Sequence, residues 1–387
     1  MNKTVSILGS TGSIGVSVFK IIDKKRNYFN INLLSANKSY SKIYYQIKKY
    51  KPKIFIVRNK LIFEKLSRKV FKGTIILNDF DFKKINKSDL TISAIPGITG
   101  LQPTLKMIKF SKKLIIANKE SIICGWDLIK KESVRSKTKI IPVDSEHFSI
   151  FQLLKGHKMN EIEKIYITAS GGPFLNYKAN QMKYIDPKKA LKHPKWKMGK
   201  KISVDSATLM NKMLELIEAQ KLFKIPSHKI DILIHPNSLI HAIIKLKNGL
   251  SKFIYHETTM IVPIANAIFE NNFDINNFYN KGKREVFENL EFRKVDEKTF
   301  PIFKIKNRLT ELPSTPIIIN ASNEVLVAHF LKKKIPFQAI FKIIMTILND
   351  RNYKKYAIRK PKNINQINKI DFWAKQKTKE KINTLYD

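Results

Sequence analysis

The chain has 387 residues, which is long for one compact core, and its composition of 43% hydrophobic and 10% aromatic residues is that of a globular protein. We therefore expect two or three domains, and wholesale disorder is excluded. No apolar run is long enough to span a membrane, so no membrane partner is expected. The only cysteine, Cys124, excludes an internal disulfide.

The net charge of +42 could indicate a nucleic-acid-binding protein, because clustered Lys and Arg displace counterions from phosphates. However, only nine of the 73 basic residues are Arg, and the Lys residues are spread along the whole chain. Ile, Asn, Phe and Tyr are abundant too, which is typical of a genome rich in A and T. We interpret the charge as a composition bias that attracts anionic substrates, and we expect no nucleic-acid partner.

The first 145 residues alternate short apolar runs with helical patterns. The predicted strands are residues 5–8, 31–35, 54–57, 74–77, 90–94, 114–117 and 140–143. This rhythm predicts an α/β fold with an N-terminal Rossmann-like parallel sheet, in which ligands lie beyond the carboxyl ends of the strands. Glycines interrupt the apolar N-terminus, which therefore indicates a strand and turn rather than a secretion signal. We expect a cytoplasmic protein.

A glycine-rich turn, Gly-Ser-Thr-Gly-Ser-Ile-Gly at 9–15, follows the first predicted strand and opens the first predicted helix. Glycines let the backbone approach a pyrophosphate, and the helix N-terminus offers free N–H groups, so the turn predicts a dinucleotide site. The second strand is followed by Asn37, Lys38 and Ser39, with one cation and no acid. An acid there would hold a ribose hydroxyl and repel a 2′-phosphate, so NADPH is favoured over NADH.

Asp144 and Glu146 directly follow the last strand of the predicted sheet. In an extended chain, residues two apart point to the same side, so we expect the two carboxylates to converge. Such a pair needs a cation, and oxygen ligands without a Cys or His cluster favour Mg²⁺ or Mn²⁺. A solvated acidic turn is the alternative.

A second polar cluster lies on a helix predicted from about Ser206 to residue 223, where Asn211, Lys212 and Glu215 share one face. They offer hydrogen bonds to hydroxyls and phosphate and one more metal ligand, although a surface ion pair would give the same pattern. Ser170 precedes two glycines in a turn that could bind an anion. Lys119 follows a predicted strand and could anchor substrate oxygens.

Four regions are predicted: a dinucleotide domain over 1–147, a central α+β catalytic domain over 148–270, a linker over 271–298, and a C-terminal helical bundle over 299–387. In the central region, Asn248-Gly249 is a pair that closes tight hairpins. After Pro301, apolar residues recur at helical spacing.

Together these segments resemble the 1-deoxy-D-xylulose 5-phosphate reductoisomerase family. The matching motifs occur in family order: GSTGSIG (9–15), ANKES (117–121), PVDSEH (142–147), ASGGPF (169–174), HPKWKMGKKISVDSATLMNKMLE (193–215), IHPNS (234–238) and NASNE (320–324). The resemblance implies an NADPH- and metal-dependent enzyme that converts this sugar phosphate to 2-C-methyl-D-erythritol 4-phosphate, towards isoprenoid precursors. It also implies a homodimer.

The resemblance assigns roles position by position. Residues implied to bind NADPH are Thr11, Gly12, Ser13, Ile14, Asn37, Lys38, Ser39, Asn118, Glu120 and Gly199. The implied metal ligands are Asp144, Glu146 and Glu215, which count among the catalytic residues together with Lys119 and His193. The implied substrate contacts are Lys119, Ser145, Glu146, Ser170, His193, Ser206, Asn211, Lys212 and Glu215. The stretch around Trp196 resembles the family's mobile lid.

Asn37 and Ser39 depart from the family pattern, and residues 259–263 lack its usual acid and arginine. The sequence leaves two alternative functions. One is another NADP-dependent enzyme, such as an aldehyde dehydrogenase, which would need Cys124 as a nucleophile. The other is a basic nucleic-acid-binding module.

Overall fold

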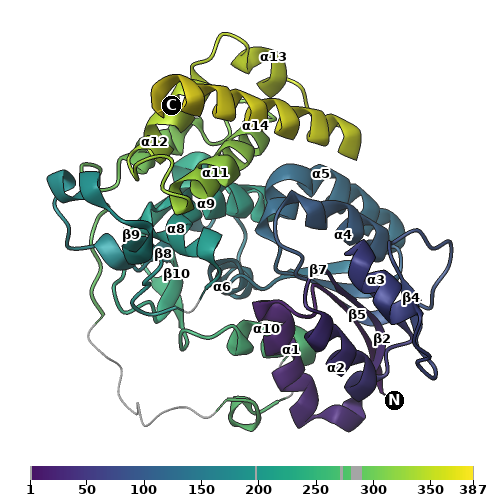
Figure 1. The fold of residues 1–387 in the computed structure, drawn as a ribbon. Helices are drawn as coiled ribbons and strands as arrows, with labels where there is room; N and C mark the ends of the chain where they lie inside the picture. Colours follow the sequence, from purple (N-terminus) through teal and green to yellow (C-terminus); the bar gives the residue numbers. More distant parts are fainter. Residues whose placement is uncertain (1, 197, 271–272, 280–289, 387) are drawn as a thin grey trace. The chain divides into compact units, whose positions relative to one another are not determined.

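The computed structural model describes residues 2–196, 198–270, 273–279 and 290–386 (Figure 1). It divides into two compact units. Unit 1 comprises Met1–Ser121, Trp126–Phe148 and Thr259–Glu285, and unit 2 comprises Ile122–Gly125, Ser149–Thr258 and Val286–Asp387. Among the described residues, no helix has both the length and the apolar character needed to cross a membrane.

Unit 1 is built on a seven-stranded parallel sheet, which confirms the α/β prediction. The strands are ordered β4-β3-β2-β1-β5-β6-β7. Their bounds are β1 (Lys3–Leu8), β2 (Phe29–Ala36), β3 (Ile54–Val57), β4 (Ile75–Leu77), β5 (Ser88–Ser93), β6 (Ser111–Ile116) and β7 (Lys139–Pro142). The order reverses at β1, so the crevice beyond the carboxyl ends of β1 and β5 is the expected ligand position in such a sheet.

The helices that accompany this sheet are α1 (Ser13–Lys24), α2 (Tyr40–Tyr50), α3 (Lys60–Ser67), α4 (Leu101–Ile108), α5 (Lys119–Ser136), α6 (Ser145–Leu153) and α10 (Ile261–Phe269), with short 3₁₀ turns η1 (Arg26–Tyr28), η2 (Ile98–Gly100) and η6 (Ile275–Asn277). Helices α1 to α5 lie between consecutive strands of this sheet, as parallel pairing favours, while α6 and α10 come later in the chain than β7. Helix α6 begins in unit 1 and continues into unit 2. The predicted linker at 271–298 lies partly outside the described residues.

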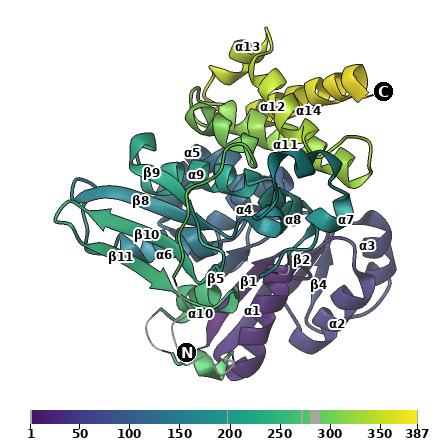
Figure 2. The same cartoon turned by 90° about the vertical axis from the view of Figure 1, so that its left-hand side faces the viewer.

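Unit 2 contains a four-stranded mixed sheet in the order β11-β10-β8-β9, with β8, β10 and β11 side by side in Figure 2. Its strands are β8 (Ile162–Ala169), β9 (Ile230–Ile234), β10 (Ile240–Leu246) and β11 (Ser251–Tyr255). The accompanying helices are α7 (Pro187–Ala190), α8 (Lys200–Ala207) and α9 (Met210–Phe223), and the 3₁₀ turns are η3 (Gly172–Phe174), η4 (Ala179–Tyr184) and η5 (Ser227–Lys229). Strands β10 and β11 form the hairpin predicted at Asn248-Gly249.

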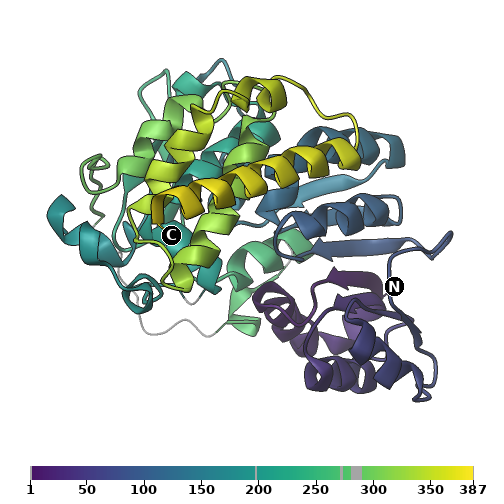
Figure 3. The same cartoon turned by 45° about the horizontal axis from the view of Figure 1, so that its top comes forward.

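The C-terminal part of unit 2 is helical, as predicted. It consists of η7 (Pro301–Arg308), α11 (Thr315–Leu331), α12 (Ala339–Leu348), α13 (Tyr353–Ala357) and α14 (Ile364–Tyr386). Helix α14 runs across α11 and α12 (Figure 3). Most of α11 is buried, including the polar side chains of Asn320, Ser322 and Asn323. These polar groups are potential links between α11 and the neighbouring elements.

One predicted helix boundary is wrong. We expected a helix to open near Ser206, but Ser206 lies in the last turn of α8, and α9 begins only at Met210. The break falls at Leu209, whose φ of 62° is left-handed and incompatible with a continuous helix. Apolar residues occur on both sides of the break, so the periodicity of the sequence did not reveal it.

The glycine-rich turn between β1 and α1 has the shape that the sequence predicts. Gly9 has a φ of 83°, and a Cβ atom there would lie 2.6 Å from the carbonyl oxygen of Ala94. A Cβ atom on Gly15 would lie 2.4 Å from the carbonyl oxygen of Ser10. The backbone N–H groups of Gly9 and Ser10 donate to the carbonyl oxygen of Ser35 at the end of β2. Only glycine fits where these segments approach one another.

Gly9→Ala should therefore destabilise the protein more than Gly73→Ala. Gly73 has a similar φ of 78°, but nothing lies within 4 Å of its Cβ position, so its substitution costs only the left-handed backbone, about 1 kcal/mol. Gly9→Ala adds the clash with Ala94, and we expect at least about 2 kcal/mol. Urea unfolding of both variants measures the difference. Equal midpoints would contradict the close approach.

Candidate active site

The predicted site residues fall into two groups, one in each unit. Unit 1 holds Thr11, Gly12, Ser13, Ile14, Asn37, Lys38, Ser39, Asn118, Lys119, Glu120, Asp144, Ser145 and Glu146. Unit 2 holds Ser170, His193, Gly199, Ser206, Asn211, Lys212 and Glu215. In unit 1 all of them follow the carboxyl ends of β1, β2, β6 or β7, as expected for a parallel sheet.

Asn118 caps α5 and ties its first turn to the loop after β5. Its Oδ1 accepts the backbone N–H of Ser121 at 2.6 Å, and its Nδ2 donates to the carbonyl oxygens of Ile95 and Gly97. The cap fixes the direction of the two charged residues that follow, Lys119 and Glu120, both of which are buried. The local sequence therefore places a cation and an acid at the edge of the sheet.

Lys119 and Asp144 form an ion pair at this edge. The distance from Lys119 Nζ to Asp144 Oδ2 is 3.2 Å, and the lysine side chain is 9% exposed. Ser145 Oγ donates to Glu146 Oε2 at 2.6 Å. The ammonium group of Lys119 thus compensates Asp144, and the hydroxyl of Ser145 compensates Glu146. Without such partners, burial would destabilise both carboxylates.

The carboxylates of Asp144 and Glu146 converge as expected, with an oxygen of each within 4.8 Å of the other, but the expected extended backbone is wrong. Asp144 immediately precedes α6, and Glu146 lies in the first turn of that helix. The backbone N–H of Phe148 donates to the carbonyl oxygen of Asp144 at 2.7 Å, so the chain turns into the helix here. The helix N-terminus also favours negative charge, which is a second reason for two acids at this position.

In unit 2, Ser170 and His193 are held together by a defined set of hydrogen bonds. His193 Nδ1 accepts the backbone N–H groups of Lys195 and Trp196, at 3.1 and 2.9 Å. The proton of the neutral ring must then lie on Nε2, which donates to Ser170 Oγ at 2.9 Å. Ser170 Oγ also accepts from the backbone N–H of Gly172. Because Oγ accepts in both of these bonds, the O–H of Ser170 remains as a hydrogen-bond donor.

His193 is kept neutral by its surroundings. Burial, and after it the positive charge of Lys212, lowers the pKa of His193 from 6.5 to about 4. Protonation would place a hydrogen on Nδ1, where two backbone N–H groups already donate. His193 therefore serves as a hydrogen-bond donor through Nε2 near neutral pH rather than as a charged group.

The turn that carries Ser170 packs directly on α8. Gly172 has a φ of 63°, and a Cβ atom there would lie 3.0 Å from the carbonyl oxygen of Ser206. On α9, Lys212 Nζ contacts Glu215 Oε2 at 2.8 Å, and Asn211 Nδ2 donates to Glu215 Oε1. The predicted face of α9 is thus confirmed, but it is buried rather than solvated, since Glu215 is 1% exposed.

A cavity of about 590 Å³ adjoins Ser170 in unit 2, a volume typical of small-molecule sites. Its lining includes Lys189, Lys192, Lys195 and Asn237. The sequence analysis did not single out these residues, because lysine is common throughout this chain. The signal that could have found them is their position: Lys195 and Asn237 lie within two of the matching motifs, at 193–215 and 234–238, and Lys189 and Lys192 shortly precede the first. Three cations around one cavity suit an anionic ligand.

The residues present fit both ligands that the sequence predicts, a dinucleotide and a divalent metal ion. The glycine turn leaves no room for a Cβ atom at Gly9 or Gly15 and presents the first N–H groups of α1, which is the cradle that a pyrophosphate needs. Asp144, Glu146 and Glu215 offer only carboxylate oxygens, the ligands that Mg²⁺ and Mn²⁺ prefer. Each unit thus supplies donors of the right chemistry.

Comparison with known proteins identifies relatives over the whole chain. Family models described as 1-deoxy-D-xylulose 5-phosphate reductoisomerase and its C-terminal domains match residues 5–125, 140–223 and 257–377. The curated enzyme of that name from Pelagibacter ubique is 45% identical, with 97% of this chain and 98% of the relative covered. The one from Clostridium tetani is 37% identical, over 98% of this chain and 100% of the relative.

Two solved structures have a similar fold. A DOX-P reductoisomerase in complex with NADPH, fosmidomycin and magnesium gives a TM-score of 0.90 at 31% identity, with 99% of each chain covered. The enzyme from Zymomonas mobilis in complex with NADPH gives a TM-score of 0.87 at 30% identity, with 100% of each chain covered.

The tautomer of His193 yields a pH prediction. Between about pH 4 and 6.5 an unfolded histidine binds a proton that the folded site refuses, so this site loses stability as the pH falls through that window. We expect imidazole ¹⁵N NMR to show the Nε2–H tautomer and a midpoint near 4. A His193 midpoint near 6.5 would contradict the hydrogen-bond pattern.

Proposed function

The chain belongs to the 1-deoxy-D-xylulose 5-phosphate reductoisomerase family, and we propose that the two residue groups described above carry the family's reaction. The protein is an NADPH-dependent reductoisomerase that converts 1-deoxy-D-xylulose 5-phosphate to 2-C-methyl-D-erythritol 4-phosphate. When bound, the divalent metal supplies Lewis-acid polarisation of substrate oxygens, and NADPH supplies the hydride that reduces the rearranged carbon skeleton.

The proposed metal ligands are Asp144, Glu146 and Glu215. Three observations support them: the donors are all carboxylates, each is held in place by a neighbouring Lys or Ser, and none is fully exposed. Buried acids with no other function would raise the folding cost of the protein, so a cation is the expected reason for them. Lys119 and Lys212 each orient one of these carboxylates.

The proposed phosphate site consists of Ser170, Ser206, Asn211 and Lys212. The contact of Gly172 with Ser206 keeps the Ser170 turn and α8 together, and Ser170 has a hydroxyl proton to donate. The lysines of the adjoining cavity add positive charge. A phosphate held here would fix the position of the reacting carbons, which accelerates the reaction by orientation. Lys119, Ser145 and His193 would contact the remaining substrate oxygens.

All of the proposed NADPH contacts lie in unit 1 except Gly199, which lies in unit 2. The proposed site consists of the glycine turn with Thr11, Gly12, Ser13 and Ile14, and of the loop with Asn37, Lys38 and Ser39, with Asn118, Glu120 and Gly199 as further contacts. The hydrogen bonds from Gly9 and Ser10 to Ser35 join the turn to the end of β2, which the loop follows. Asn37 and Lys38 are exposed there, so they are accessible to a 2′-phosphate.

Three further proposals concern the regions of the chain, the oligomeric state and the cellular location. We propose that 1–147 act as the NADPH-binding region, 148–270 as the catalytic and dimerisation region, 271–298 as a linker and 299–387 as a helical support. A homodimer is proposed because β11 is an edge strand of its sheet and leaves Leu250 and Phe253 exposed. A cytoplasmic location is proposed because a single cysteine suits a reducing compartment.

A dehydrogenase that uses a catalytic cysteine is disfavoured. Cys124 is buried within α5, and its Sγ accepts a long hydrogen bond of 3.8 Å from Asn320. A nucleophile must reach its substrate as a thiolate, and burial in apolar surroundings works against that.

Activity should depend on a divalent metal and on Glu215. NADPH consumption with 1-deoxy-D-xylulose 5-phosphate should stop with a chelator and return with Mn²⁺. Glu215→Gln should lower kcat by about a thousandfold at saturating Mn²⁺, because an amide binds the ion poorly. The control is Asp371→Asn, which removes another partly buried, lysine-paired carboxylate from α14. Full activity of Glu215→Gln would refute the ligand assignment.

The cofactor preference should depend on Lys38. We expect kcat/KM to be at least about a hundredfold higher with NADPH than with NADH, and Lys38→Met to weaken NADPH binding about tenfold without affecting NADH. The control is Lys53→Met. Lys53 immediately precedes β3, whereas Lys38 follows the carboxyl end of β2, so this variant removes the same charge at the other edge of the sheet and should change neither the NADPH nor the NADH dissociation constant. Equal losses in both variants would indicate a general charge effect instead.

A further inference from the structure

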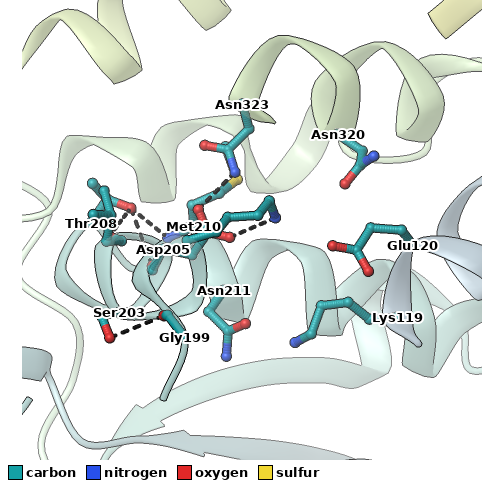
Figure 4. A network of polar contacts seen from close by, with 12 residues as sticks. Lys119, Glu120, Gly199, Ser203, Asp205, Thr208, Met210, Asn211, Asn320 and Asn323 are labelled. Carbon is teal, nitrogen blue, oxygen red and sulfur yellow. Dashed lines mark hydrogen bonds and ion pairs between the residues drawn. The ribbon is translucent and has the colours of Figure 1, made fainter. Parts of the chain in front are cut away.

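Asp205 is a buried carboxylate with no role in the reaction as described so far. It is 1% exposed and immediately precedes Ser206 on α8. Asp205 Oδ2 contacts Lys201 Nζ at 2.8 Å. Asp205 Oδ1 accepts from Asn323 Nδ2 at 2.7 Å, and a dashed line joins these two residues in Figure 4. Lys201 lies on the same helix, whereas Asn323 lies on α11, 118 positions later in the chain.

Asn323 belongs to the motif Asn-Ala-Ser-Asn-Glu at 320–324, for which no role has been found above. It is fully buried. The next residue, Glu324, pairs with Lys375 on α14 at 2.8 Å. This short stretch of α11 therefore bonds α8 through one side chain and α14 through the next. The C-terminal helices are joined to the helix that carries Ser206.

Helix α8 is thereby fixed from two directions. On one side Gly172 packs against the carbonyl oxygen of Ser206, which would lie 3.0 Å from a Cβ atom at Gly172. On the other, Asn323 holds Asp205. A further bond fixes the C-terminal end of the helix, where Thr208 Oγ1 accepts the backbone N–H of Met210 across the left-handed Leu209. Because α8 has only eight residues, a shift at Asp205 moves Ser206 as well.

We propose that the Asp205–Asn323 hydrogen bond is a positioning device that sets Ser206 at the distance from Ser170 that a substrate phosphate requires. The inference rests on the proposed function of Ser170 and Ser206 as phosphate ligands. Asp205 itself does not touch the substrate. A carboxylate suits this role better than a neutral acceptor, because a hydrogen bond to a charged group is stronger and shorter, and therefore holds its geometry more tightly.

Reciprocal substitution tests the bond. Asn323→Asp places two carboxylates against each other, so they repel and α8 moves. The double variant Asp205→Asn with Asn323→Asp restores one acceptor and one amide donor in reversed order. We expect the single variant to raise KM for the sugar phosphate and the inhibition constant of inorganic phosphate by at least about tenfold, and the double variant to recover most of both losses.

The pattern of the kinetic constants separates positioning from general damage. A loss of folded enzyme lowers kcat and leaves KM unchanged, whereas a displaced Ser206 raises KM for the sugar phosphate and leaves KM for NADPH within about twofold. If Asn323→Asp does not fold, Asn323→Leu removes the donor without adding charge and should show the same KM pattern. A double variant no better than the single one, or parallel changes in both KM values, would overturn the proposal.

Ser322→Ala is the matched control. Ser322 is as deeply buried as Asn323 on the same helix, but its Oγ has no hydrogen-bond partner among the described residues. Its substitution should leave every constant unchanged, and a tenfold rise in KM there would count against the proposal. If the unmodified protein does not turn over the sugar phosphate at all, the proposed function fails instead, and the two failures are distinguishable.

Discussion

Burial of carboxylates in a strongly basic chain is the constraint on which this structure depends. Only 31 acids accompany 73 basic residues, yet several acids lie inside the protein. Three of the acids in and beside the site are paired with a lysine: Asp144 with Lys119, Glu215 with Lys212 and Asp205 with Lys201. An isolated buried charge would cost several kcal/mol, so these pairs compensate the acids and orient them.

Backbone shape provides the second requirement, because the polar groups converge only where the chain turns sharply. The turn at Gly9 brings the N-terminus of α1 to the end of β2, and Gly172 brings the Ser170 turn onto α8. The left-handed Leu209 separates α8 from α9, so Ser206 and Lys212 belong to different helices. Left-handed backbone at a non-glycine residue is costly and persists only where the surroundings enforce it.

The excess of lysine has different consequences in different places. Over most of the surface it contributes solubility and a general attraction for anions. Beside Ser170, three lysines line one cavity, where their positive electrostatic potentials add up. Burial, and after it the charge of Lys212, lowers the pKa of His193, so that a histidine usable as an acid or base serves as an oriented donor.

The sequence alone determined the features that depend on local pattern. Alternating apolar runs predicted the parallel sheet, Asn248-Gly249 the hairpin, and the spacing of Asn211, Lys212 and Glu215 their common face, because periodicity and turn chemistry act over a few residues. Tertiary structure decided the rest. The helical start at Ser145, the break at Leu209, and the bond between Asp205 and Asn323 arise from packing between segments far apart in the chain. No local pattern encodes such contacts, since each depends on where another element comes to lie.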